Sequence, residues 1–141
     1  MTAAELILSL GLAVSQPLAD AIDRHCDDVA CRADAVATCY VETRCQLGHC
    51  GSNGCGPFQQ LGRYADDIPE LVELTIPERR ELLNTCPDTA MRQYLAVMTR
   101  YRSRYGDRWP RRYNGSARAD AYLEHWWTIR RRLARFKNGG E

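Results

Sequence analysis

The sequence lacks the features that would assign it to a specialised class of protein. It has no low-complexity tract and no internal repeat, which argues against a disordered chain and against a solenoid. The apolar stretch from Leu6 to Val14 is shorter than the roughly 20 residues that cross a bilayer. Alternation of apolar and polar residues, which marks strands, is scarce. We therefore expect one predominantly helical domain over residues 1–141.

The same apolar stretch also lacks the preceding Lys or Arg that a secretory signal peptide carries. Ala19-Asp20-Ala21 resembles a signal cleavage site, so residues 1–25 keep a weak signal-like character. Leu6, Leu10 and Val14 nevertheless recur on one face of an amphipathic helix. We interpret residues 1–25 as an N-terminal helix of the domain.

Charge is nearly balanced over the whole chain but unevenly placed along it. The formal net charge is +1, with aspartates concentrated between Asp20 and Asp34 and arginines between Arg100 and Lys137. This asymmetry suggests an anionic partner, although arginines at helical spacing also commonly form a solvated face. No nucleic-acid recognition motif accompanies the arginines, so we expect no nucleic-acid partner. We expect a monomer.

Cysteine is the residue present in excess. Seven cysteines are more than a cytosolic protein of this length usually contains, which indicates an extracytoplasmic place of work: secreted, periplasmic or delivered to the cell wall. Because the number is odd, at least one thiol is free or pairs between chains, and we expect up to three disulfides. The candidates are Cys26, Cys31, Cys39, Cys45, Cys50, Cys55 and Cys86.

Zinc is the competing use of these cysteines. Cys45, His49, Cys50 and Cys55 form a cluster in the sequence, but their spacing lacks the C-x2-C pattern of structural zinc sites. We expect neither a metal nor an organic cofactor.

Helical periodicity places Glu42 where a buried helix meets a turn-rich loop. Apolar residues from Val29 to Val41 recur at intervals of three and four, and the glycine-rich segment Gly48–Gly62 suits a short hairpin. Further helices are expected after the capping residue Thr75, over Met91–Tyr105 and over Tyr122–Phe136, with a loop over Trp109–Gly115. These ranges complete the expected helical framework.

Glycosidic bond cleavage near neutral pH needs a carboxylic acid whose pKa is raised by partial burial. Glu42 is placed for that role, but a Glu at a helix end is more often a solvated charge. The sequence motif around Glu42 therefore has to distinguish a catalytic acid from a solvated charge.

That motif consists of CYVETRC at 39–45, Cys50, and GSNGCGPFQ at 51–59. It resembles the invertebrate-type lysozymes, or destabilase family, whose pattern is C-x-x-E-S-x-C, then C, then G-S-x-x-C-G-P-F-Q. The likeness extends over about residues 36–130 and includes Tyr64, Asp67 and Tyr113-Asn114-Gly115. The resemblance implies an α+β, mainly helical lysozyme-like fold with a hairpin beside a sugar-binding cleft. It also implies a muramidase that cleaves the β-1,4 bond between N-acetylmuramic acid and N-acetylglucosamine in peptidoglycan strands, with Glu42 as general acid.

The chain departs from the family in its second carboxylate. The family's catalytic Asp precedes the Gly-Ser that matches Gly51 and Ser52, and that stretch is absent here. Asp66 and Asp67 are the nearest substitutes, but we expect neither to act as nucleophile. The family cysteine matching Ala90 is also missing. Cys86 is thus left with a different partner or none, and the cysteines at 39, 45, 50 and 55 are expected to clamp the loop over the Glu42 helix.

A looser similarity connects the chain with lytic transglycosylases. Glu42, Ser52, Gly56, Gln59, Tyr113 and Asn114 follow the order of residues in that class. With one acid, Glu42 either acts with a water positioned by Ser52, Asn53 or Gln59, or supports attack by the muramyl 6-hydroxyl and gives an anhydro product. A non-catalytic wall-binding module is the third alternative. Expected substrate contacts, each of which is equally consistent with loop packing, come from Ser52, Gln59, Tyr64, Tyr113 and Asn114.

Overall fold

The computed structural model describes residues 1–51, 54–114 and 118–139, and its elements are predominantly helical. The described α-helices are α1 (Ala3–Ser9), α2 (Gln16–His25), α3 (Val29–Thr43), α4 (Pro69–Val72), α5 (Ile76–Thr85), α6 (Pro87–Tyr105), α7 (Trp109–Asn114) and α8 (Ala119–Gly139). Short 3-10 turns, η1 (Gly62–Tyr64) and η2 (Gly106–Arg108), precede α4 and α7. One antiparallel hairpin, β1 (Cys50–Gly51) with β2 (Gly54–Cys55), completes an α+β architecture.

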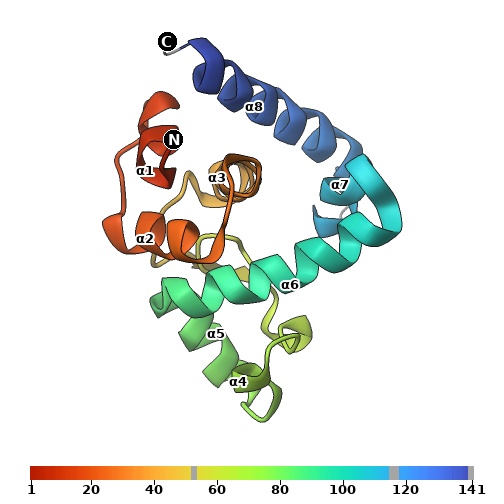
Figure 1. Ribbon diagram of the computed structural model, residues 1–141. Coiled ribbons are helices and arrows are strands. Elements are labelled where there is room, and N and C mark those ends of the chain that lie inside the picture. Colours follow the sequence, from red (N-terminus) through yellow and green to blue (C-terminus); the bar gives the residue numbers. More distant parts are fainter. Residues whose placement is uncertain (52–53, 115–117, 140–141) are drawn as a thin grey trace.

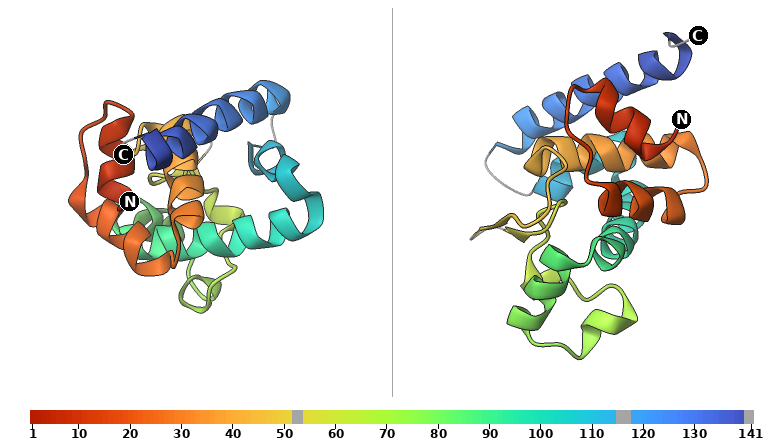
Figure 2. Two further views of the ribbon diagram at one scale, coloured as in Figure 1. Left: turned by 45° about the horizontal axis from the view of Figure 1, so that its top comes forward. Right: turned by 90° about the vertical axis from the view of Figure 1, so that its left-hand side faces the viewer.

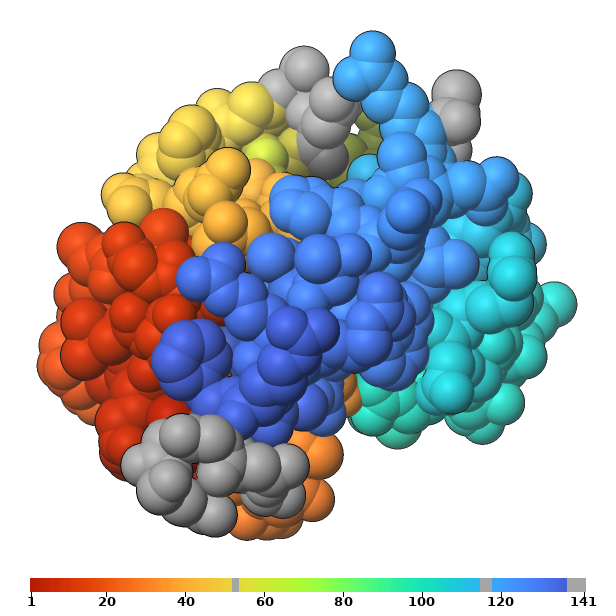
Figure 3. All heavy atoms as spheres, turned by 90° about the horizontal axis from the view of Figure 1, so that it is seen from above, coloured from red at the N-terminus to blue at the C-terminus, as the bar shows by residue number. Residues whose placement is uncertain are grey.

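Helix α3 runs through the centre of the molecule and the other long helices surround it (Figure 1). Helix α8 packs on α3 from one side, α1 packs on both, and α6 contacts α2, α5 and α7. Figure 2 shows α5 and α4 projecting on the side away from α8. Seen from above, α8 lies between the N-terminal helices and the end of α6 (Figure 3). The predicted α+β, mainly helical architecture with a small hairpin is confirmed.

The N-terminal region forms two helices, so the single helix predicted over residues 1–25 is wrong. Helix α1 ends at Ser9 because Gly11 adopts a φ of 79°, and α2 begins anew with Pro17 in its first turn. Leu6 and Ile7 are fully buried, so α1 belongs to the core. No helix in the described ranges is long and apolar enough to cross a membrane.

Helix α3 is anchored at both ends by side-chain hydrogen bonds. Asp28 caps the start by accepting the Cys31 backbone N–H at 2.8 Å. The helix ends at Thr43 because Arg44 takes the left-handed conformation, with φ 59°. The Thr43 hydroxyl then donates to the Pro57 carbonyl at 2.8 Å, which ties the helix end to the glycine-rich loop. This contact fixes the position of the neighbouring Glu42.

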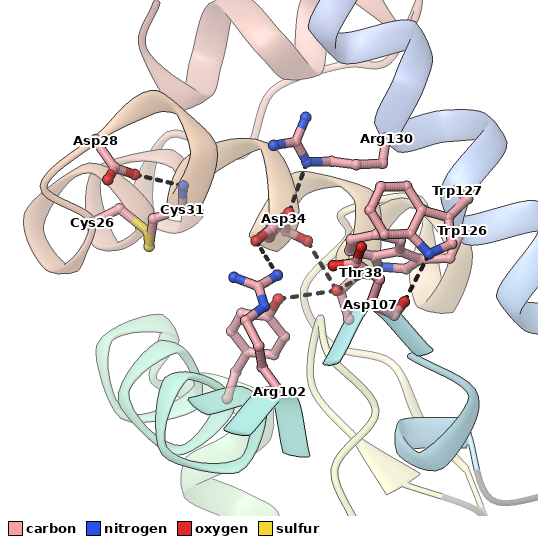
Figure 4. A network of polar contacts seen from close by, with 11 residues as sticks. Cys26, Asp28, Cys31, Asp34, Thr38, Arg102, Asp107, Trp126, Trp127 and Arg130 are labelled. Carbon is pink, nitrogen blue, oxygen red and sulfur yellow. Dashed lines mark hydrogen bonds and ion pairs between the residues drawn. A yellow bond between two sulfur atoms is a disulfide. The ribbon is translucent and has the colours of Figure 1, made fainter. Parts of the chain in front are cut away.

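A buried polar network joins α3 to α6 and α8 (Figure 4). The Asp34 carboxylate pairs with Arg102 at 2.5 Å and with Arg130 at 2.7 Å. One helical turn further on, the Thr38 hydroxyl accepts the indole N–H of Trp126 at 3.0 Å. Two arginines of the basic C-terminal half thus pair with an internal carboxylate.

Three disulfides form, as the cysteine count predicts, and they are Cys26–Cys31, Cys39–Cys45 and Cys50–Cys55. Cys86 is free and half-buried. Cys39–Cys45 joins the Glu42 helix to the start of the loop, as the expected clamp requires, whereas Cys50–Cys55 closes the hairpin on itself. The Thr43–Pro57 hydrogen bond adds a second connection between the helix end and the loop.

The disulfides also provide evidence on whether the cysteines bind zinc and on the compartment in which the protein folds. Cys45, Cys50 and Cys55 are oxidised, so they have no thiolate to offer a metal ion. Within the described part of the chain, no three His, Cys, Asp or Glu side chains gather as a metal site. Three disulfides are consistent with folding in an oxidising compartment.

The segment predicted as a loop over 109–115 contains helix α7 up to Asn114, so that prediction is wrong. Trp109 and Tyr113 are four residues apart and meet edge to face, with ring centroids 6.1 Å apart. Pro110 occupies the first turn, where the missing N–H costs nothing. The tryptophan is fully buried, and tertiary packing therefore stabilises a helix that is too short to form alone.

Candidate functional site

A cavity of about 530 Å³ opens where the end of α3, the segment after the hairpin, α6 and α7 meet. Its volume lies within the range of small-molecule sites. It is lined by Glu42, Gln59, Gln60, Leu61, Tyr64, Ala65, Gln93, Val97, Arg100, Tyr101, Tyr113 and Asn114. The structure therefore brings Glu42 together with four of the predicted substrate-binding residues, Gln59, Tyr64, Tyr113 and Asn114. The fifth, Ser52, lies outside the described residues, as does Asn53.

Glu42 sits in the last turn of α3 with its carboxyl group facing this cavity. Burial strips water from the carboxylate and raises the pKa of Glu42 from 4.5 to about 7. The Tyr122 hydroxyl donates to Glu42 Oε2 at 3.3 Å and partly opposes that rise. A carboxyl group with this pKa exists in both protonation states near neutral pH, as a general acid that later acts as a base requires.

Two tyrosines adjoin the Glu42 carboxyl group, and both remain neutral. Burial, reinforced by the charge of Glu42, raises the pKa of Tyr113 and of Tyr122 well above the ordinary value. The Tyr113 hydroxyl donates to the Phe58 carbonyl at 2.6 Å. Behind this wall, the Phe58 and Tyr94 rings stack with centroids 4.5 Å apart. The cavity wall is thus continuous with the aromatic core, because Tyr94 contacts both Phe58 and Tyr113.

The glycine-rich loop brings Gln59 to the cavity in a strained conformation. Gln59 has a φ of 48°, and its side-chain amide donates to the carbonyls of His49 at 3.0 Å and Gly56 at 2.9 Å. Gly56 has a φ of 81°, and a Cβ at this position would collide with the Leu83 carbonyl on α5. Only glycine fits at position 56, and this steric requirement explains the glycine of the CGPFQ sequence.

Asp66 and Asp67 do not line the cavity. The Asp67 carboxylate accepts the Gln93 amide at 2.6 Å and pairs with Arg100. Asp66 is exposed. Among the cavity-lining residues that the structure describes, Glu42 is the one carboxylic acid. Neither Ser52-Asn53 nor the stretch 115–117 contains an Asp or Glu, so those segments offer no second carboxylate.

Sequence reasoning missed the contribution of α6 to this site. Gln93, Arg100 and Tyr101 line the cavity, whereas the sequence placed Tyr101 only within an expected helix and Arg100 only at the start of the basic segment. Their spacing holds the signal, because positions 93, 97, 100 and 101 share one face of a helix. The Tyr122 contact with Glu42 was also missed, since it joins α8 to α3 over 80 residues of sequence.

No protein-family model, no curated protein and no solved structure matches the chain. The resemblance to invertebrate-type lysozymes therefore stays a prediction from the motif.

Proposed function

We propose that this protein is a lysozyme-like enzyme that cleaves the β-1,4 bond between N-acetylmuramic acid and N-acetylglucosamine in peptidoglycan, with Glu42 as general acid. The observation that carries the proposal is a single cavity-facing carboxyl group whose pKa is raised to about 7. Amide and phenol side chains surround it, which suits hydroxyl- and acetamido-bearing sugars. The helical architecture with a hairpin next to the Glu42 helix agrees with the fold that the resemblance implies.

The first chemical step follows from the protonation state of Glu42. Its neutral form donates a proton to the glycosidic oxygen as the bond to the muramyl anomeric carbon breaks. The electron pair of that bond leaves with the N-acetylglucosamine O4, which takes the proton and becomes a hydroxyl group. The resulting Glu42 carboxylate then faces an oxocarbenium-like sugar. Partial burial strengthens the electrostatic stabilisation of that cation by the carboxylate.

The second step must proceed without a second carboxylate. A retaining or inverting glycosidase of the usual kind needs two carboxyl groups across the bond, and the described cavity has Glu42 alone. In hydrolysis, Glu42 accepts a proton from a water that Gln59 helps to position, and the oxygen of that water joins the anomeric carbon. This is the route that the proposed muramidase follows.

The single carboxyl group also favours a second candidate, a lytic transglycosylase. Here the muramyl 6-hydroxyl oxygen attacks the anomeric carbon while Glu42 accepts the hydroxyl proton. The product is a 1,6-anhydro sugar, and no water is consumed. One residue serves as acid and then as base, which microscopic reversibility allows. Both routes share the same first step and the same acid.

The proposal is tested by incubating purified peptidoglycan with the wild-type protein, with Glu42→Gln and with Asp66→Asn. Asp66 is exposed and outside the cavity, so its variant controls for the loss of one negative charge. We expect release of soluble muropeptides by the wild type and the control, and a loss of at least about a hundredfold in Glu42→Gln, as for a general acid. Tight binding without release would instead assign a wall-binding module.

A further inference from the structure

The face of α6 that lines the cavity continues beyond it. Gln93, Val97 and Tyr101 line the cavity at intervals of four residues. Because a helix turns once every 3.6 residues, Arg104 and Tyr105 extend the same stripe by one more turn. In Figure 1 this end of α6 leads to α7, whose Tyr113 and Asn114 also line the cavity. The stripe therefore begins at the proposed site of cleavage and leads away from it.

Rings and guanidinium groups alternate along this extension. The Tyr101 and Tyr105 rings meet edge to face with centroids 6.2 Å apart. Arg100 lies over Tyr101, with its guanidinium carbon 5.3 Å from the ring centroid. Arg104 and Arg112 both lie over Tyr105, at 5.6 Å and 5.0 Å. We call these five residues the α6 track.

The far end of the track carries positive charge that no carboxylate in the described part of the chain pairs with. Arg104 and Arg112 are exposed, and neither makes an ion pair with a described residue. Arg100, at the cavity end of the track, pairs with Asp67. At the far end, the acidic residue nearest in sequence is Asp107 in η2. The far end of the track thus presents two guanidinium groups held against a tyrosine ring, which reduces the entropy lost when they bind a ligand.

We propose that the α6 track binds the carboxylate-bearing peptide stems and the sugar faces of the glycan strand that enters the cavity. This inference rests on the proposed function. Guanidinium groups bind carboxylates through paired hydrogen bonds, and tyrosine rings offer flat apolar surfaces to sugar rings. Peptidoglycan combines both chemistries in one polymer, and the continuity of the track with the cavity favours the same strand as its ligand.

The test measures binding of the non-cleaving Glu42→Gln protein to peptidoglycan freed of other wall polymers. In that background, Arg104→Gln with Arg112→Gln removes two charges from the track. The matched control, Arg131→Gln with Arg132→Gln, removes two exposed charges from α8. We expect the track variant to bind about tenfold more weakly and the control to change less than about twofold, since charged hydrogen bonds are lost only in the first. Amidating the peptidoglycan carboxylates should abolish the difference between the two.

Equal weakening in both double variants would overturn the proposal, because it would indicate general electrostatic attraction. Binding to single-stranded DNA as tight as to peptidoglycan would also overturn it. Circular dichroism and thermal unfolding of each variant check that its fold is intact. Cleavage by the wild type is scored separately. Intact glycan together with track-dependent binding would refute the proposed function and support the role of the track in binding. Cleavage together with binding that does not depend on the track would support the proposed function and refute the role of the track.

Discussion

The hydrogen bond from Tyr122 to Glu42 gives a prediction with a defined sign. The Tyr122 hydroxyl donates to the carboxylate at 3.3 Å and so favours the charged form. Tyr122→Phe removes that donor while keeping the ring, and the pKa of Glu42 must rise above its value of about 7. A hydrogen bond to an ionised group contributes about 1.5–3 kcal/mol, and this one is long, so we take about 1.4 kcal/mol. That energy corresponds to a shift of about one pKa unit.

The effect of Tyr122→Phe on catalysis depends on whether the protonated or the ionised form of Glu42 is active. In the proposed mechanism the protonated carboxyl group delivers the proton, so activity should fall as the pH rises through the pKa of Glu42. Tyr122→Phe should therefore move the alkaline limb of the kcat/KM profile upward by about one unit. The pKa of Glu42 itself can be read independently from the carboxyl carbon signal in an NMR titration.

Tyr113→Phe is the matched control for this experiment. Tyr113 also adjoins Glu42, but its hydroxyl donates to the Phe58 carbonyl. Its loss should leave the alkaline limb within a few tenths of a pH unit. An unchanged or lowered pKa in Tyr122→Phe, or equal shifts in both variants, would refute the assignment of Tyr122 as the residue that tunes Glu42.

Two further predictions concern stability. The pKa of Glu42 is raised from 4.5 to about 7 on folding, so its ionisation opposes folding, and stability is lost as the pH rises from about 4.5 to about 7. Glu42→Gln removes this ionisation. The change that it causes in the free energy of unfolding, measured by urea titration, should therefore be about 3 kcal/mol more favourable at pH 8 than at pH 4. An equal change at both pH values would show that the pKa of Glu42 is not raised by burial. Asp34→Asn should destabilise the protein by about 3 kcal/mol because it leaves Arg102 and Arg130 without their buried partner, and a change below about 1 kcal/mol in the same assay would show that solvent replaces the carboxylate.

The elements whose signals are local follow directly from the sequence. The apolar spacing from Val29 to Val41 gives α3, and Thr75 with Glu78 forms the predicted capping box at the start of α5. The glycine-rich segment yields the hairpin, and the collision at Gly56 explains one of its glycines. In each case the information lies within one or two turns of chain.

The features that escaped prediction depend on contacts between distant segments. Helix α7 is too short to be stable alone and exists because Trp109 is buried in the core. The break between α1 and α2 was obscured because the apolar pattern continues across Gly11. Within the site, Glu42 and Gln59 were found through a local motif. The partners Arg100, Tyr101 and Tyr122 come from α6 and α8, and their own sequence neighbourhoods give no signal of a role in the site.

Glu42, as the one carboxylic acid in the described cavity, is proposed to break the muramyl bond. Digesting peptidoglycan in water enriched in oxygen-18, followed by mass spectrometry of the muropeptides, measures this role. New muramyl ends should appear with the wild type and vanish with Glu42→Gln. An oxygen-18 label on those ends would indicate hydrolysis, and anhydro ends lighter by one water would indicate the transglycosylase route. Glycan strands left intact by the wild type, or cut equally by Glu42→Gln, would refute the role of Glu42 as general acid.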